Sequence, residues 1–187
     1  MFGLFSNKTK KTKREDDIIW QTEDIKIRNI ILCLADYSQN SDSIMIVAHF
    51  PKTLENLKVA AKISNSKLRD LHTASDVDRW VAGYYKEHVI ILSKAIQWNS
   101  TQPPIVQEEH KKKILVAEHF PTPEKDISLM NWAIAVKAEN IQWYESIDSP
   151  IFTRFGGDQI TILAEKLGWQ QDEPMQHRFI TSSIGSM

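Results

Sequence analysis

Short apolar runs alternate with segments of helical spacing along most of this 187-residue chain. Such alternation predicts an α/β fold in which a mostly parallel sheet carries helices on both faces. About five strands are predicted, most of them with the composition of strands covered on both faces: 43–50, 67–74, 88–98, 114–120 and 140–147. The last of them is polar enough to predict a place near the sheet edge. Helices are predicted between and around these runs: 22–38, 52–63, 75–87 and 123–136.

The starts of the predicted helices carry residues with a physical reason to be there. Pro51 and Pro123 suit a first helical turn, where the fixed φ of proline fits and its missing N–H leaves no bond unmade. Ser75, followed three residues later by Asp78, predicts a capping box at the start of the third helix. A long loop is expected over 99–113, because that stretch holds two adjacent prolines and then a run of charge.

The composition predicts one globular domain in the cytoplasm. The chain is 42% hydrophobic and 25% charged with a net charge of −1, so no overall positive field would recruit nucleic acid. Cys33 is the only cysteine, which excludes a disulfide framework and a multi-thiolate metal site within one chain. No apolar run approaches the roughly 18 to 20 residues that cross a bilayer.

The first thirteen residues are predicted to be a flexible basic tail in front of a single domain over 14–187, with a helical extension from about 149. Two interpretations of the tail remain open. It is either a disordered segment or a weak, salt-sensitive contact with an anionic membrane, in which apolar side chains insert and lysines face the lipid headgroups. The residues of that contact are Phe2, Leu4, Phe5, Lys8, Lys10, Lys11 and Lys13.

The tripeptide His-Phe-Pro occurs twice, at 49–51 and at 119–121, each time directly after a predicted strand. Two similar strand-to-helix corners can converge on similar residues. The alternative is a site for acid–base chemistry or a metal at the carboxyl ends of the strands, where parallel sheets bind ligands; its residues would be His49, His72, Glu118 and His119. Glu118 and His119 are adjacent in extended chain and are therefore expected to point to opposite faces.

Most motifs of catalytic chemistry are missing. The chain has no G-x-S-x-G nucleophile elbow and no G-x-x-x-x-G-K-[ST] phosphate loop. The stretch "RFGGDQ" (154–159) lacks the third glycine of a dinucleotide fingerprint. Trp80 and Trp132 fall in predicted helices, where core packing explains them, and no basic stripe accompanies the tryptophans to form a stacking platform for nucleic acid.

The two ends of the chain resemble the second nucleotide-binding domain of the SecA preprotein-translocase ATPase family. The C-terminal part is similar to five successive phrases of that family: F-Y-x-S-x-[DE]-D, R-F-G-[SG]-[DE]-R-[IV], L-G, [DE]-x-[EP]-I-E-H and [KR]-[AS]-I. The residues that match these phrases are Tyr144, Ser146, Arg154, Phe155, Gly156, Asp158, Ile160, Leu167, Gly168, Glu173, Pro174, His177, Ser183 and Ile184. The start is similar to its entry phrase R-x-D-x-[VI]-[YF]-x-T-x-x-x-K through Arg14, Asp17, Trp20, Thr22 and Lys26. The resemblance spans most of 14–184 and implies a three-layer RecA-like domain of helicase C-terminal type.

The middle of the chain departs from that family. Where the family has G-R-G-T-D at a strand end, this chain reads "ILSKAIQWNS" (91–100). Where the family has the Q-x-x-G-R-x-G-R helix with its arginine fingers, this chain reads "PEKDISLMNWAIAVKAEN" (123–140), which holds no arginine. An arginine finger contributes orders of magnitude to phosphoryl transfer. The resemblance with these losses therefore implies a domain that does not hydrolyse ATP.

The function expected from these features is that of a catalytically inactive, SecA-like interaction module. Its partners would be proteins, with the secretion machinery and the membrane surface as the settings that the resemblance suggests. No catalytic residue, cofactor or metal is predicted. The predicted interaction surface lies at the carboxyl ends of the strands and comprises His49, Phe50, Trp98, Glu118, His119 and Phe120. For its aromatic residues the other interpretation is that they close the former nucleotide cleft and complete the core. The alternative is a small-ligand or nucleotide-binding enzyme that uses His49, His72, Glu118 and His119.

Overall fold

The computed structural model of the chain describes residues 12–38, 43–85, 87–97, 111–155, 162, 166, 168–170 and 173–176. Within this part an eight-stranded sheet forms the centre of the molecule, in the order β4-β5-β3-β6-β7-β2-β8, and β1 pairs with β7 as well. All pairings are parallel except that of β8 with β2. The strands are β1 Lys13–Arg14, β2 Ile18–Trp20, β3 Ser43–Ala48, β4 Leu68–Leu71, β5 His88–Leu92, β6 Lys112–Val116, β7 Asn140–Ser146 and β8 Met175–Gln176.

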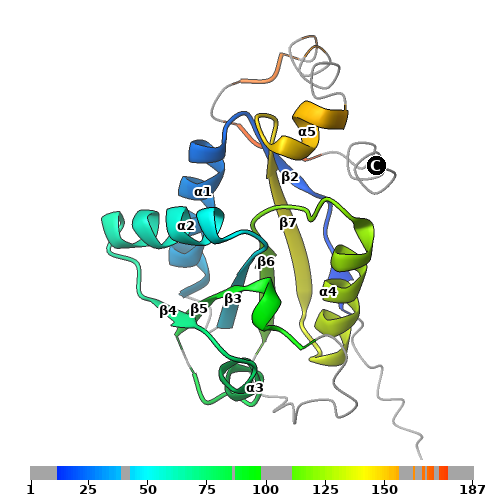
Figure 1. Cartoon of the computed structure of the whole chain (residues 1–187). Coiled ribbons are helices and arrows are strands. Elements are labelled where there is room, and N and C mark those ends of the chain that lie inside the picture. The colour runs from blue at the N-terminus through cyan, green and yellow to red at the C-terminus, as the bar shows by residue number, and fades with distance from the viewer. Residues whose placement is uncertain are drawn as a thin grey trace, which may run out of the picture.

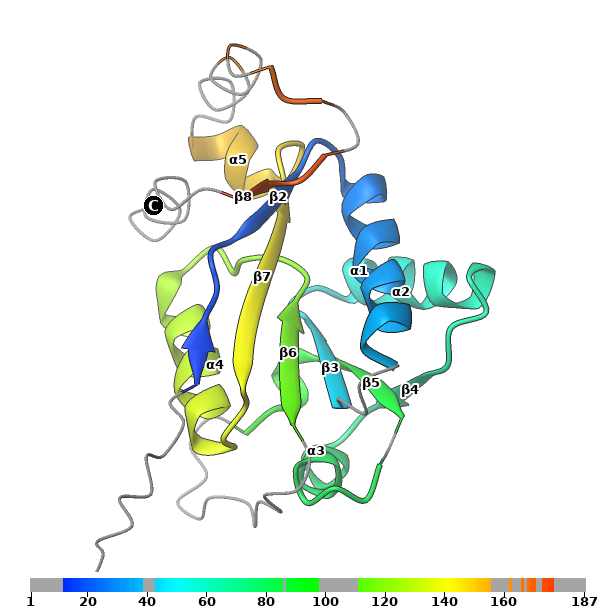
Figure 2. The same cartoon turned by 180° about the vertical axis from the view of Figure 1, so that it is seen from behind.

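Helices cover both faces of this sheet (Figures 1 and 2). They are α1 Glu23–Ser38, α2 Pro51–Ile63, α3 Ala74–Val81, α4 Pro123–Ala135 and α5 Pro150–Phe155, and a short 3-10 helix, η1, spans Ser93–Ala95. One core lies under α1 and α2 and includes Ile30, Leu57 and Ala61. The other lies under α3 and α4 and includes Trp80 and Trp132. The predicted α/β class, with helices on both faces of a mostly parallel sheet, is confirmed, as is the core position of these two tryptophans.

The strand count and the edge position were predicted wrongly. The structure adds the short strands β1, β2 and β8, which escape a search for apolar runs because each has only two or three residues. The segment predicted near the sheet edge is β7, which has the short strands β2 and β8 outside it and is buried along most of its length. Two of its buried polar residues have partners, since Gln142 donates to the backbone carbonyl of Asp16 and Glu145 accepts from the His119 N–H.

Three local boundaries also differ from the sequence prediction. The capping box of α3 is made by Thr73 and Asp76, not by Ser75 and Asp78, since the Thr73 hydroxyl accepts from the Asp76 N–H and the Asp76 carboxylate accepts from the Thr73 N–H. The strand predicted to run to residue 98 ends at Leu92 and turns into η1. Lys13, assigned to the tail, belongs to β1 and pairs with Asn140.

Some predictions fall outside the described residues. These are the tail positions Phe2, Leu4, Phe5, Lys8, Lys10 and Lys11, the aromatic Trp98, residues 99–110 of the predicted loop, and the Gly156-Gly157 break. The last two residues of that predicted loop, Lys112 and Lys113, belong to β6. No helix in the described part of the chain is long and apolar enough to cross a membrane.

Candidate functional site

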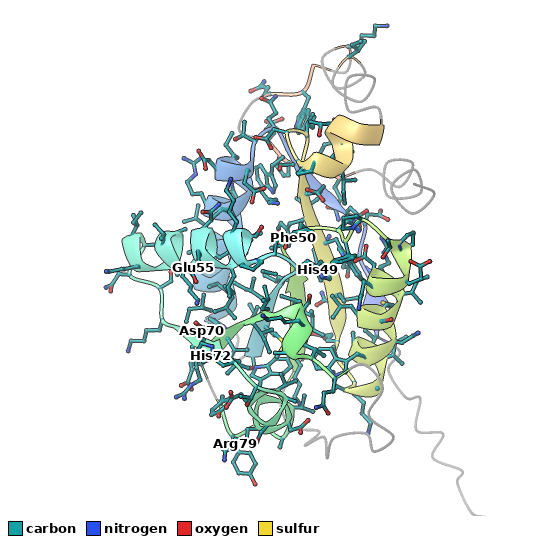
Figure 3. The ribbon with its side chains drawn as sticks, viewed as in Figure 1. His49, Phe50, Glu55, Asp70, His72 and Arg79 are labelled. Carbon is teal, nitrogen blue, oxygen red and sulfur yellow. The ribbon has the colours of Figure 1, made fainter. Side chains whose placement is uncertain are left out.

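The carboxyl ends of β3, β5 and β6 bring the two His-Phe-Pro corners together. His49 and Phe50 follow β3 and lead directly into α2 (Figure 3), Ser93 follows β5, and Glu118 and His119 follow β6. Parallel strands place these positions at one edge of the sheet, which is the edge where open α/β sheets bind ligands. His49, Glu118 and His119 are all buried, with less than a tenth of each residue exposed.

The Glu118 carboxylate occupies the N-terminal end of α2. Its Oε1 accepts hydrogen bonds from the backbone N–H of His49 at 2.5 Å and of Phe50 at 3.1 Å, and Thr53 in the first turn also bonds to this side chain. The free N–H groups and the dipole of a helix start attract an anion, and here the chain supplies that anion itself. Burial raises the pKa of Glu118, while Lys26 and these hydrogen bonds act in the opposite direction.

A second carboxylate, Asp126 in the first turn of α4, joins the two histidines. His119 Nδ1 lies 2.6 Å from Asp126 Oδ2, and His49 Nε2 lies 3.3 Å from Asp126 Oδ1. His119 Nε2 lies 3.3 Å from Asp17 Oδ2, and His49 Nδ1 lies 3.0 Å from Ser93 Oγ. The result is a buried polar chain that runs Ser93, His49, Asp126, His119, Asp17.

The pKa values of His119 and Asp126 in this polar network are shifted in the directions that favour an ion pair. Burial alone would lower the pKa of His119, but hydrogen bonds to Asp126 and Asp17 outweigh burial and raise it to about 9. Burial alone would raise the pKa of Asp126, but hydrogen bonds to His119 and His49 outweigh it and lower it to about 2. Near neutral pH, His119 is therefore a cation between carboxylates.

A third group of charges lies beside the end of β7. The ammonium of Lys26, which is almost fully buried, lies 2.7 Å from Glu23 and 3.8 Å from Glu145. Burial disfavours the charged lysine, but Glu145, Glu23 and Glu118 together raise its pKa. Glu145 also accepts from the backbone N–H groups of His119 and Ser146. Lys26 thus supplies the positive charge that compensates the buried Glu145 carboxylate.

Aromatic rings cover the outer side of the polar chain. The Phe50 and Phe120 rings stack with centroids 5.8 Å apart, and the His49 ring meets Phe120 edge-on at 5.4 Å. Phe50 is 39% exposed. On the inner side, His119 stacks on Trp143 at 5.8 Å, and the Arg14 guanidinium lies 4.7 Å from the Trp143 ring centre.

The structure brings together three of the four residues predicted for a ligand site. Glu118 reaches toward α2 and Lys26 while His119 stacks on Trp143 under α4, so the two adjacent side chains point to opposite faces, as expected. His72 is not part of the group: it follows β4 near the sheet edge, is largely exposed, and lies 3.7 Å from Asp70 (Figure 3). Among the described residues, no group of three or more His, Cys, Asp or Glu is arranged to hold a metal ion.

The order Ser93, His49, Asp126 has the chemical types of an acyl-transfer triad. Two features of the geometry oppose that activity. Ser93 is 8% exposed, and the backbone N–H pair at the start of α2, a possible oxyanion site, already donates to Glu118. The arrangement pairs buried charges of opposite sign, and its hydroxyl, that of Ser93, is buried.

Sequence reasoning missed Asp17, Lys26, Asp126 and Glu145 as members of this network. The first-turn position of Asp126, directly after a His-Phe-Pro corner, was the available signal, because acids in a first helical turn commonly bind backbone N–H groups. Asp126 indeed accepts from the Phe120 N–H at 3.3 Å. Asp17 gave no such signal, since it directly precedes β2, a strand of only three residues that the apolar pattern does not predict.

Comparison with known proteins gives a fold and no family. No protein-family model matches the chain. No curated protein matches it. Among solved structures, the C-terminal part of the Fun30 ATPase domain has a TM-score of 0.50 at 16% identity, with 86% of this chain and 51% of that chain covered.

Two further structures are more distant. The Hef helicase domain of Pyrococcus furiosus has a TM-score of 0.47 at 9% identity, covering 75% of this chain and 28% of that chain. T4 UvsW has a TM-score of 0.46 at 9% identity, covering 67% and 26%. This chain thus spans about half the length of the Fun30 structure and less of the other two. The comparisons give no support to SecA specifically, so that resemblance rests on the sequence alone. The chain has a RecA-like α/β fold, as in the C-terminal part of the Fun30 ATPase domain.

Proposed function

We propose that this chain is a RecA-like domain of SecA type that does not hydrolyse ATP and acts as a protein-interaction module, with its partners in protein export. The observation that carries the proposal is the Glu118 carboxylate at the start of α2. A triphosphate at this edge of the sheet would meet Glu118 and Asp126, two acids that already hold the backbone N–H groups of both strand-to-helix corners.

The sequence of α4 supports the same conclusion. The family resemblance places arginine fingers on this helix, but α4 reads "PEKDISLMNWAIA" and contains no arginine. Cationic His119 lies between Asp126 and Asp17 and is buried, so it cannot replace a finger that must reach a phosphate. A domain with internally neutralised charges keeps its shape without a nucleotide, which suits a binding role.

The stacked pair Phe50–Phe120 is the proposed contact with the protein partner. Phe50 is 39% exposed and Phe120 is partly exposed, whereas His49, Glu118 and His119 are buried and hold these two rings in place from below. Aromatic anchors supported from beneath are typical of the residues that dominate binding energy at interfaces.

The first experiment is a thermal-shift and ATPase panel on the purified chain with ATP, ADP, GTP and divalent metals. We expect no shift in Tm and no turnover, because the acids at this edge would repel a triphosphate. The measurement is sensitive enough, since a ligand at a hundred times its Kd would stabilise the folded state by about 2.7 kcal/mol. Turnover that disappears in a Glu118→Gln or His49→Ala variant would contradict the proposal and favour the alternative, a small-ligand enzyme at this edge.

The second experiment tests the contact itself. Phe50→Ala and Phe120→Ala variants should lose partner proteins that the unchanged chain retains from native extract, each by tenfold or more, as for an interface anchor. Tyr84→Ala is the matched control, because Tyr84 is a 74% exposed aromatic after α3 and away from the pair. Equal loss of the retained proteins in all three variants would show non-specific adhesion. Full retention in all three would show that Phe50 and Phe120 do not form the contact.

A further inference from the structure

Helix α4 is apolar on two opposite faces. Its inner face packs Leu129, Trp132 and Ala133 into the core. Its outer face carries Ile127 and Ile134, which are 58% and 50% exposed, with Met130 partly buried between them. The spacing of i, i+3 and i+7 aligns these three side chains in one stripe, here called the outer stripe of α4. A surface helix normally pairs an apolar face with a polar one, so the outer stripe indicates a helix that is covered on both sides.

The N-terminal segment of the chain meets the domain at the same place. Thr12 donates from its hydroxyl to the Ala138 carbonyl at 2.6 Å, and the Lys13 N–H donates to the Glu139 carbonyl at 3.0 Å. These carbonyls lie in the turn that follows α4, and β1 starts beside the C-terminal end of that helix in both views (Figures 1 and 2). Ile134 is only four residues before Ala138 and is thus the stripe residue nearest to this entry point.

We infer that the N-terminal residues Phe2, Leu4 and Phe5 bind the outer stripe of α4 and cover Ile127, Met130 and Ile134. The segment has the composition that such a stripe requires, since its apolar residues lie at one end and its lysines between them and the domain. This inference does not rest on the proposed function.

The lengths agree with this placement. From Thr12 back to Phe5 the chain has seven residues, which span up to about 25 Å when extended. From Ile134 to Ile127 the helix rises about 10 Å. The tether also replaces a bimolecular encounter with an intramolecular one, at an effective concentration on the order of millimolar, so three modest apolar contacts suffice. A membrane or a second copy of the chain must compete with that local segment.

A cysteine pair can measure the contact. In a Cys33→Ser background, which has no other cysteine, Ser6→Cys places a thiol next to Phe5 and Asn131→Cys places one at an exposed position beside Met130. The measurement is the rate of intramolecular disulfide formation under a fixed oxidant. The matched control is the same pair in a chain with Phe2→Ser, Leu4→Ser and Phe5→Ser, which keeps the tether, its reach and both thiols.

We expect the disulfide to form at least about tenfold faster with the native apolar residues than with serines. Ile127→Ser with Ile134→Ser should slow it equally, and both side chains are exposed enough for the fold to be unaffected. Equal rates in all forms would overturn the inference. A cross-linked dimer whose yield rises with protein concentration would overturn it in favour of a second copy. Equal rates together with sedimentation on anionic vesicles, lost in the serine form, would overturn it in favour of a membrane.

Discussion

The carboxylate of Glu118 lies 2.5 Å from the backbone nitrogen of His49 and thereby joins the two His-Phe-Pro corners of the sheet. Glu118 follows β6 and His49 follows β3, two neighbouring parallel strands. One corner therefore supplies the side chain that closes the other. The two corners are similar because both turn a strand into a helix. Because they contact each other, their polar side chains form a single buried network.

Replacing Glu118 with alanine should destabilise the protein by about 2 to 4 kcal/mol. The change leaves the buried His49 and the half-buried Phe50 N–H groups without an acceptor, and each unsatisfied group costs about 1 to 3 kcal/mol. The measurement is the free energy of unfolding in urea. Glu55→Ala on the exposed side of α2 is the matched control and should cost less than about 0.5 kcal/mol. A Glu118→Ala cost as small as that of the control would contradict the capping role.

The His119–Asp126 pair should make stability fall as the solution becomes alkaline. Because the pKa of His119 is raised from 6.5 to about 9 on folding, its contribution is fully present below about pH 6.5 and is lost as the pH rises through 9. The loss should reach about 1 to 3 kcal/mol, since a pKa shift of one unit corresponds to about 1.4 kcal/mol. The two groups titrate as a coupled pair, so the shift of His119 is not assigned to this residue alone. Urea unfolding at pH 6, 7.5 and 9 measures it. A His119→Gln variant should lack this alkaline decline, and a decline of equal size in both proteins would assign it to other groups.

The same pair should also protect the fold against acid. The pKa of Asp126 is lowered from 3.8 to about 2, so its contribution is present above about pH 3.8 and disappears as the pH falls through 2. Asp126→Asn should therefore be less stable than the unchanged protein at pH 5 by about 1 to 3 kcal/mol, with a gap that narrows toward pH 2. Circular dichroism during acid titration follows both proteins. A gap that stays constant with pH would show that the cost comes from packing.

Lys26 and Glu145 should depend on each other. Lys26→Met leaves the fully buried Glu145 with its main counter-charge removed and should cost about 3 to 5 kcal/mol. Adding Glu145→Gln removes the stranded charge and should recover part of that loss. A double-variant cycle on unfolding free energies measures the coupling. Strict additivity of the two single variants would exclude a direct electrostatic link.

The start of α3 offers a comparison of two neighbouring hydroxyls. Thr73→Ala should cost about 1 kcal/mol, because the Thr73 side chain accepts from the Asp76 N–H and forms the capping box. Ser75→Ala should be nearly neutral, because Ser75 is an exposed residue in the first turn and does not form the cap. Thermal unfolding of the two variants is sufficient, and a larger effect at Ser75 would restore the cap that the sequence suggested.

The parts of the fold that could be predicted are those with a local signal. The runs that became β3, β5 and β6 are largely continuous and apolar, and α1, α2 and α4 have clear spacing or a proline start. β1, β2 and β8 could not be predicted, because two or three residues show no periodicity and are strands only through their partners. The interior position of β7 depended on these same short strands, so the two errors have one cause.

For the candidate site, the sequence indicated the edge of the sheet but not the chemistry. His49, Glu118 and His119 were placed correctly at the strand ends because each directly follows an apolar run. Their partners were out of reach of sequence reasoning, since Asp17 and Lys26 come from the first part of the chain and meet the site only through tertiary packing. The burial of the histidines follows from those partners, because a buried charge needs a neighbour of opposite sign.

The pairing of β2 with β7 has a consequence for biosynthesis. Ile18 is paired with Tyr144 and Trp20 with Ser146, so the earliest described strands wait for residues made more than a hundred positions later. While the ribosome is still extending the middle of the chain, Ile19 lacks Phe152, the late residue with which it is buried in the finished protein. The β2 end of the sheet can therefore form only after the final third of the chain has emerged.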